Sequence, residues 1–200
     1  MNREKAIQTI MTSIASDTAI VSSTGLISRE IFEKFDSVRN LYVPGSMGLA
    51  SSIGLGLAIS LPDKQVLVID GDASLLMNLG SLVTIGNLQP RNLLHIVLDN
   101  GAYASCSEEC SMSHTAHIDK LAVDVGYQYV KTVNEESGLR HAILTFMDGP
   151  SLILAHIELG GRRDFLRPLQ LTQIKKRFML FLKQPTKGDV HHENERQDYL

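Results

Sequence analysis

The sequence has no tryptophan and only two cysteines among its 200 residues, and aromatic side chains make up 6% of it. Two cysteines cannot form the disulfide framework of a small secreted protein, so a reducing, cytoplasmic setting is expected. No apolar run reaches the roughly 18 residues that a membrane-spanning helix needs. The first residues carry charges without an apolar core, so no signal peptide is expected.

Charge of one sign is also not in excess. Lys and Arg number 19 against 22 Asp and Glu, which gives a net charge of −3. This balance gives no reason to expect nucleic acid or an anionic membrane as a partner. The hydrophobic content of 44% over 200 residues is instead typical of a single globular domain with a sizeable core.

The sequence does contain an alternation of strand-like and helix-like segments. The segments at 64–70 and 92–100 are apolar almost throughout, which is typical of parallel strands covered on both faces. Other strands are expected at 18–24, 127–133 and 150–159, with a short one opening 40–48. Helices are expected at 1–17, 28–35, 49–61, 74–88, 119–126, 137–148 and 171–182, and the first places Ala6, Ile7, Ile10, Met11 and Ile14 on one face.

This alternation predicts an α/β fold: a single three-layer domain over residues 1–184, with a mostly parallel sheet and helices on both faces. Residues 101–118 show no clear period and are expected to form a long loop. Residues 185–200 are polar, so we expect a disordered tail in which His191 and His192 have no role.

Three polar turns follow expected strands, at the sheet edge where open parallel sheets bind ligands. They are Gly45-Ser46-Met47-Gly48, Gly71-Asp72-Ala73-Ser74 and Asp99-Asn100-Gly101-Ala102. A helix that begins near Ala73 favours a phosphate, to which Ser74 adds a hydroxyl donor. Because Asp72 would repel that phosphate, a cation is expected between them. Mg²⁺ suits this position, with the Asn100 side-chain oxygen and the Ala102 carbonyl as further ligands.

The pattern Gly-Asp-x-Ser, followed one helix and one strand later by x-Asn-Gly-x-Tyr, resembles the cofactor motif of the thiamine diphosphate-dependent decarboxylases. The resemblance implies that Asp72, Asn100 and Ala102 hold Mg²⁺. It also implies that the following residues contact thiamine diphosphate: Gly71, Asp72, Ala73, Ser74, Asn100, Ala102, Tyr103 and Ala104. Two positions depart from the family pattern, since Ala73 replaces a glycine and Asp99 replaces an asparagine.

The Gly45 turn resembles the segment that bends the cofactor in that family. The resemblance implies that the Gly45 carbonyl accepts a hydrogen bond from the pyrimidine amino group. Met47 would form the apolar wedge beneath the cofactor, and Ser46 lies between the two residues.

Longer segments resemble one branch of the family, the phosphonopyruvate and sulfopyruvate decarboxylases. The run RDFLRP at 163–168 is closer to the phosphonopyruvate side. This implies a three-carbon 2-oxo acid with a phosphonate, whose charge Arg162, Arg163 and Arg167 would neutralise. It also implies a partner subunit that binds the pyrimidine and carries the catalytic Glu. No catalytic residue is therefore assigned to this chain, and a hetero-oligomer is expected.

Four alternatives remain. Three of them involve thiamine diphosphate: a sulfopyruvate decarboxylase beta subunit, another thiamine enzyme such as a carboligase, and a subunit that binds the cofactor without catalysis. A Rossmann nucleotide-binding module is disfavoured, because Gly25 is not followed by the required glycine pattern.

The loop after the Asn100 turn carries Cys106, Cys110, His114 and His117 at a spacing that a zinc site can use. We favour a polar active-site loop, because residues 104–117 are expected to close over the substrate and a metal would pin them. Three other histidines are expected in the core, and three hydroxyl residues at the substrate entrance. These are His95, His141 and His156, and Ser23, Thr24 and Ser28.

Overall fold

The computed structural model describes residues 1–184, and the predicted tail with His191 and His192 lies outside these residues. Six strands form one sheet in which every neighbouring pair is parallel, in the order β2-β1-β3-β4-β6-β5. The strands are β1 (Ala19–Ser22), β2 (Asn40–Tyr42), β3 (Val66–Gly71), β4 (Leu93–Asp99), β5 (Tyr129–Val133) and β6 (Ser151–His156). The predicted parallel α/β fold is therefore confirmed.

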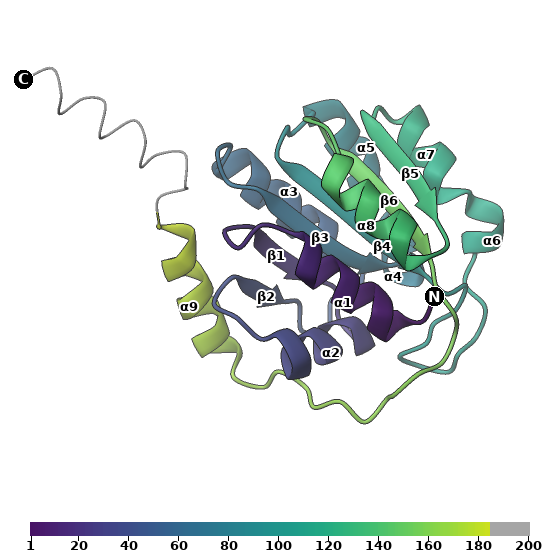
Figure 1. Ribbon diagram of the computed structural model, residues 1–200, viewed down its shortest axis with the longest axis horizontal. Helices are drawn as coiled ribbons and strands as arrows, with labels where there is room; N and C mark the ends of the chain where they lie inside the picture. Colours follow the sequence, from purple (N-terminus) through teal and green to yellow (C-terminus); the bar gives the residue numbers. More distant parts are fainter. Residues whose placement is uncertain (185–200) are drawn as a thin grey trace, which may run out of the picture.

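Helices cover both faces of this sheet (Figure 1). Those of the described part are α1 (Arg3–Ser13), α2 (Leu26–Phe35), α3 (Ala50–Ser60), α4 (Asp72–Leu76), α5 (Gly80–Leu88), α6 (Ser113–Ala116), α7 (Ile118–Asp124), α8 (Glu136–Thr145) and α9 (Leu171–Leu182). Helices α1, α2 and α8 pack on one face, and α3, α4, α5 and α7 on the other. Over residues 1–184, no helix has both the length and the apolar character needed to cross a membrane.

Each strand contributes to two cores, because its side chains alternate between the faces. In β3, Leu67 and Ile69 pack toward α1, α2 and α8, whereas Val66 and Val68 pack toward α3 and α5. Each such side chain contributes roughly 1.5–3 kcal/mol through burial. The two-sided burial explains why the strand segments are apolar almost without interruption.

The predicted helix at 74–88 is wrong in one respect, since it is divided into α4 and α5. At this break, the side chain of Asn78 contacts the turn that contains Gly48. The Asn78 side-chain amide donates to the Gly48 carbonyl at 3.0 Å and to Ser52 Oγ at 3.2 Å. These contacts fix the break between α4 and α5, and no local periodicity in the sequence indicates them.

Two of the three predicted core histidines are exposed. His95 on β4 is fully buried, as expected. His141 faces solvent on α8, and the side chain of His156, the last residue of β6, is 47% exposed. The error has a simple cause, because an apolar neighbourhood in the sequence does not identify the outward face of a helix or the open end of a strand.

Helix α3 lies close to the sheet because Gly54 has no side chain. A Cβ added at Gly54 would overlap Val68 Cγ2 on β3, whereas one added at Gly56, on the exposed side, would meet no atom within 4 Å. The two glycines therefore have different roles within one helix.

We expect Gly54→Ala to lower the free energy of unfolding by about 1–3 kcal/mol, because it overpacks the contact with Val68. The matched variant Gly56→Ala should raise it by roughly 0.5–1 kcal/mol, since alanine is the better residue in a helix interior. Urea denaturation of both variants tests this. Equal changes in the two variants would contradict the packing argument.

Candidate functional site

A cleft opens at the carboxyl edge of the sheet, where the chain order reverses. Strand β2 lies to one side of β1 and strand β3 to the other, and such switch points form ligand crevices. We name this the Asp72 cleft. Predicted site residues from several turns line it together: Met47, Gly71, Asp72, Ala73, Ser74, Asn100, Ala102 and Ala104.

Three predicted residues lie outside the lining of the cleft. Gly45 borders a neighbouring cavity, Ser46 is exposed, and Tyr103 is half-buried. Ser46 adopts a φ of 46°, in the left-handed region. The Gly45 N–H donates to Thr24 Oγ1 at 3.1 Å, which ties this turn to the end of β1.

Asp72 is a buried carboxylate at the start of α4, with 2% of its surface exposed. Burial raises the pKa of Asp72, and the nearby negative charge of Asp99 raises it further. A hydrogen bond from the Ser111 hydroxyl opposes this rise, as do the backbone N–H groups of Ala73 and Asn100. A cation beside Asp72 would offset both the burial and the repulsion.

Asn100 and Ala102 lie in a tight turn after β4. The Asn100 Oδ1 accepts from the Ala102 N–H at 3.0 Å, and the Ala102 carbonyl accepts from the Ala104 N–H at 2.9 Å. Each oxygen keeps a further lone pair for a ligand. A carboxylate, an amide oxygen and a carbonyl at one cleft are the donors that Mg²⁺ uses together with phosphate oxygens. The residues present therefore fit a magnesium ion.

Asp99, which replaces the asparagine of the motif, stabilises the turn from the other side. One of its oxygens accepts from the Gly101 N–H at 3.0 Å, and the other lies 3.3 Å from His156 Nδ1. It borders a separate cavity with His114 and His117 rather than the Asp72 cleft. Asp99 thus acts on Asp72 through its charge and not as a neighbouring ligand.

Ser74 has a structural role that the sequence did not indicate. Its Oγ accepts from the Gly48 N–H at 3.1 Å and so links α4 to the turn after β2. That its hydroxyl also donates to a ligand stays a prediction. Because α4 has only five residues, its dipole is smaller than the predicted helix at 74–88 would provide.

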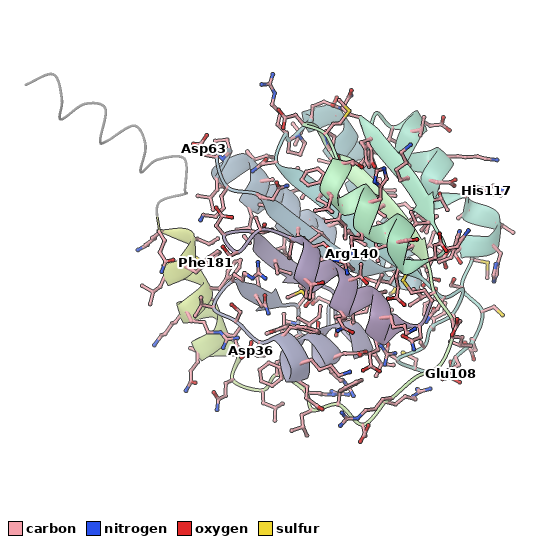
Figure 2. The ribbon with its side chains drawn as sticks, in the orientation of Figure 1. Asp36, Asp63, Glu108, His117, Arg140 and Phe181 are labelled. Atoms are coloured by element: carbon pink, nitrogen blue, oxygen red, sulfur yellow. The ribbon has the colours of Figure 1, made fainter. Side chains whose placement is uncertain are left out.

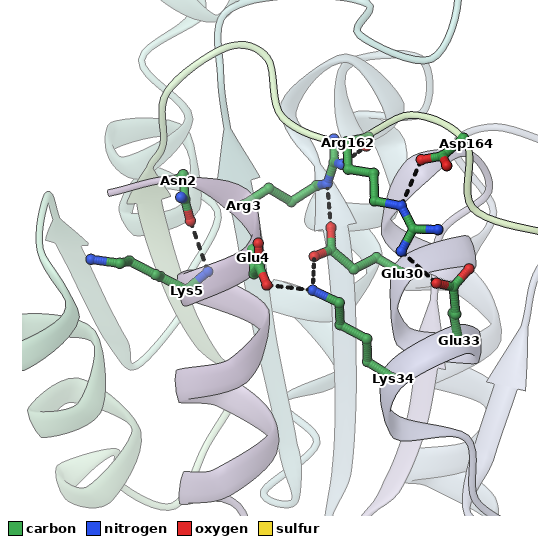
Figure 3. A network of polar contacts seen from close by, with 9 residues as sticks. All are labelled: Asn2, Arg3, Glu4, Lys5, Glu30, Glu33, Lys34, Arg162 and Asp164. Carbon is green, nitrogen blue, oxygen red and sulfur yellow. Dashed lines mark hydrogen bonds and ion pairs between the residues drawn. The ribbon is translucent and has the colours of Figure 1, made fainter.

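Arg3 is a cleft residue that sequence reasoning missed. It lines the Asp72 cleft, and its Nε lies 2.7 Å from Glu30 Oε2, with both side chains nearly fully buried (Figure 3). Its Nη2 donates to the Arg162 carbonyl at 2.5 Å. A signal existed, because Arg3 shares the apolar face of α1 with Ile7 and Ile10, where a cation requires a buried partner.

Ser23 is a second cleft residue with unused hydrogen-bonding capacity. The sequence placed it at the substrate entrance, and it lines the cleft at the end of β1 with 2% of its surface exposed. Its Oγ has no hydrogen-bond partner among the described residues. Buried hydroxyls are usually paired, so this one is suited to a ligand in the cleft.

The three arginines predicted to neutralise the substrate differ from one another. Arg162 pairs with Glu33 and Asp164, both at 2.6 Å (Figure 3), and Arg163 pairs with Glu108. These two charges are already neutralised by the chain. Arg167 makes no ion pair in the described part and lines the cavity that Gly45 borders.

The loop after Asn100 is anchored at both ends. The Ser111 N–H donates to the Gly101 carbonyl and the Tyr103 N–H to the Glu109 carbonyl, both at 2.8 Å. The short helix α6 lies within the segment predicted to be irregular throughout. That this loop closes over the substrate stays a prediction.

The zinc-like spacing of Cys106, Cys110, His114 and His117 does not correspond to a cluster. Both cysteines are exposed and free. Across residues 1–184, no three His, Cys, Asp or Glu side chains lie together in a way that would hold a metal ion. The magnesium donors described above are of a different kind, since only one of them is a carboxylate.

The sequence matches a known protein family. Residues 28–155 match the family described as "Thiamine pyrophosphate enzyme, C-terminal TPP binding domain". The chain belongs to this family. The family membership confirms the resemblance drawn from the three turns.

Two relatives within this thiamine pyrophosphate enzyme family differ in length. A phosphonopyruvate decarboxylase from Streptomyces viridochromogenes is 35% identical over 93% of this chain, which spans only 47% of that protein. A sulfopyruvate decarboxylase subunit beta from Methanothermobacter thermautotrophicus is 38% identical over 90% of this chain, which spans 94% of that subunit. The chain is thus about half the length of the first relative and close to the full length of the second.

Solved structures support the same fold at low sequence identity. A 2-oxoglutarate:ferredoxin oxidoreductase from Magnetococcus marinus superposes with a TM-score of 0.66 and 15% identity, over 85% of this chain and 65% of that one. A putative thiamin diphosphate-dependent enzyme from Mycobacterium smegmatis gives 0.65 and 17%, over 79% and 32%. The predicted thiamine diphosphate-binding fold is therefore confirmed.

Ser111→Ala should weaken Mg²⁺-dependent binding of thiamine diphosphate by about 10–100-fold, as the loss of groups that orient metal ligands does. The hydroxyl removed is the one that holds the Asp72 carboxylate. Calorimetric titration measures the change. The exposed Ser107 of the same loop provides the control, Ser107→Ala, which should bind as the wild type does. Unchanged affinity in Ser111→Ala would contradict the assigned role.

A pH dependence follows from the raised pKa of Asp72. Between the ordinary value of 3.8 and the raised one, the folded chain binds the proton more tightly than the unfolded chain. The contribution of Asp72 to stability therefore falls as the pH rises through this window. Asp72→Asn removes the effect. In Mg²⁺-free buffer, its Tm should match the wild type near pH 3 and exceed it by a few degrees at pH 7. A difference independent of pH would contradict this.

Proposed function

We propose that this chain is the diphosphate-binding subunit of a thiamine diphosphate- and Mg²⁺-dependent 2-oxo acid decarboxylase. The observation that carries the proposal is the convergence of Asp72, Asn100 and Ala102 on one cleft, in a member of the thiamine pyrophosphate enzyme family. The substrate is proposed to be phosphonopyruvate, which the reaction would convert to phosphonoacetaldehyde and carbon dioxide.

Each cleft residue has a distinct task in this proposal. The oxygens of Asp72, Asn100 and Ala102 hold Mg²⁺, and the hydroxyl of Ser74 binds the diphosphate. The Gly45 carbonyl and the Met47 side chain orient the pyrimidine. When bound, thiamine diphosphate would supply an electron sink for the electron pair that stays behind on the substrate when carbon dioxide leaves.

The cleft supports the need for a second chain. Its volume of about 50 Å³ is far below the ~300–1,000 Å³ of usual ligand pockets, and Gly45 and Ser46 lie exposed beside it. We propose that a pyrimidine-binding partner subunit covers these residues and supplies the catalytic Glu. The two relatives agree with this proposal. One is about twice as long as this chain, and the other is named as a beta subunit.

Sulfopyruvate decarboxylase is the second candidate, and a specific observation favours it. The chain spans nearly all of the Methanothermobacter beta subunit but only half of the Streptomyces phosphonopyruvate enzyme. In that case the acid group on the third carbon is a sulfonate, and the cleft residues keep the same tasks.

Asp72→Asn tests the proposal. In the complex with the partner subunit, we expect Mg²⁺-dependent binding of thiamine diphosphate to fall by more than about 100-fold, beyond the usual cost of losing an outer-shell group. Decarboxylation of both acids should be lost with it. Calorimetry and carbon dioxide release measure the two effects.

Asp63→Asn is the control, because Asp63 is an exposed aspartate at the end of the molecule far from Glu108 and the loop that carries it (Figure 2). It should bind and react as the wild type does. A complex that decarboxylates equally well with asparagine at position 72 would refute the assignment of Asp72 to the metal ion. A wild-type complex that decarboxylates neither acid would refute the proposed function.

A further inference from the structure

A second cavity lies beside the Asp72 cleft. It has a volume of about 400 Å³, and Arg29 and Arg167 line it, so we name it the arginine cavity. Thr24, Met47 and Ser105 line both this cavity and the cleft. The two spaces are therefore neighbours with a shared boundary of three residues.

The arginine cavity has no negative charge of its own. No Asp or Glu lines it. Arg29 and Arg167 make no ion pair with any described residue, whereas Arg3, Arg162 and Arg163 each have an acidic partner. Burial lowers the pKa of Arg29, and the charge of Arg167 lowers it further. Both guanidinium groups are thus close to each other and without a counterion.

The start of α2 adds to this positive region. Gly25, at its N-cap, also lines the arginine cavity and offers no side chain to the free N–H groups of the helix. Arg29 is the fourth residue of α2, near the end where the helix dipole disfavours a cation. Three positive features therefore converge on one cavity, an arrangement that is unfavourable until an anion enters.

We propose that Arg29 and Arg167 bind the tetrahedral anionic group, a phosphonate or a sulfonate, on the third carbon of the 2-oxo acid. The inference rests on the proposed function and names its substrate class. Guanidinium groups bind such oxyanions through paired, charge-assisted hydrogen bonds. A short acid that reacts in the Asp72 cleft would extend past Met47 and Ser105 into the arginine cavity. Arg29 was not among the arginines that the sequence indicated.

A non-reactive analogue tests the inference directly on the full chain. 3-Phosphonopropionate has the length of phosphonopyruvate and lacks the 2-oxo group, and 3-sulfopropionate is its sulfonate counterpart. In NMR titrations we expect both to perturb the amides at the start of α2, and propionate to perturb them far less. Arg29→Ala and Arg167→Ala should each weaken binding by about 10–100-fold, the usual effect of one charged hydrogen-bonding partner.

Arg91→Ala is the matched control, because Arg91 is exposed just before β4, at the opposite edge of the sheet. It should bind the analogues as the wild type does. Arg29→Gln, which keeps a polar side chain, guards against a packing effect, and it should weaken binding as Arg29→Ala does. Since neither arginine is paired, the Tm of each variant should not fall.

A kinetic experiment in the assembled holoenzyme completes the test. The two alanine variants should raise the KM for the anionic acid about 10–100-fold and leave pyruvate, which has no such group, unaffected. Equal analogue binding by the wild type and both variants would overturn the inference, as would a contact by these arginines with a partner carboxylate. If the analogues bind through the arginines while the wild-type complex decarboxylates neither acid, the anion site stands and the proposed function fails.

Discussion

The burial of one carboxylate beside a second acidic side chain is the constraint on which the rest of the site depends. Asp72 is almost fully removed from water and lies near the charge of Asp99, so burial and repulsion both raise its pKa. The Ser111 hydroxyl offsets only part of this cost. Six parallel strands make the arrangement unavoidable, because the ends of β3 and β4 bring the two acidic turns to one edge. The fold therefore creates a position that a divalent ion stabilises.

The arginine cavity presents the same situation with the opposite sign. Arg29 and Arg167 repel each other as Asp72 and Asp99 do, and Met47 lines both the arginine cavity and the Asp72 cleft. Local conflicts of this kind are expected at functional sites, where the surrounding fold supplies the stability. Arg3, by contrast, is a buried arginine that pairs with Glu30. Arg91 also makes no ion pair in the described part, so what sets Arg29 and Arg167 apart is that both line one cavity that no carboxylate lines.

The sequence predicted what depends on local pattern and missed what depends on distant contacts. Apolar runs such as Val66–Ile69 are buried on two faces, so the unbroken apolar character of these segments identified the parallel strands. The turns at Asp72 and Asn100 were found because each follows such a run. Ser111 was not, since it contacts Asp72 across 39 positions of the chain. Arg29 was missed for a related reason, because its neighbour Arg167 comes from an irregular segment that no periodicity places against α2.

The loop between Asn100 and α6 connects these parts of the site. Ser111 fixes the loop through two hydrogen bonds, one from its N–H to the Gly101 carbonyl and one from its hydroxyl to Asp72. Ser105 and Cys106, in the middle of the loop, line the arginine cavity. An ion that binds Asp72 would contact the carboxylate that accepts the hydrogen bond from Ser111. An acid in the arginine cavity would lie beside Ser105. In the proposed function, the metal ion and the substrate would therefore contact opposite parts of one short loop. If the bound ion changes the affinity for the acid through this loop, the acid must change the affinity for the ion by the same factor, because linkage is reciprocal.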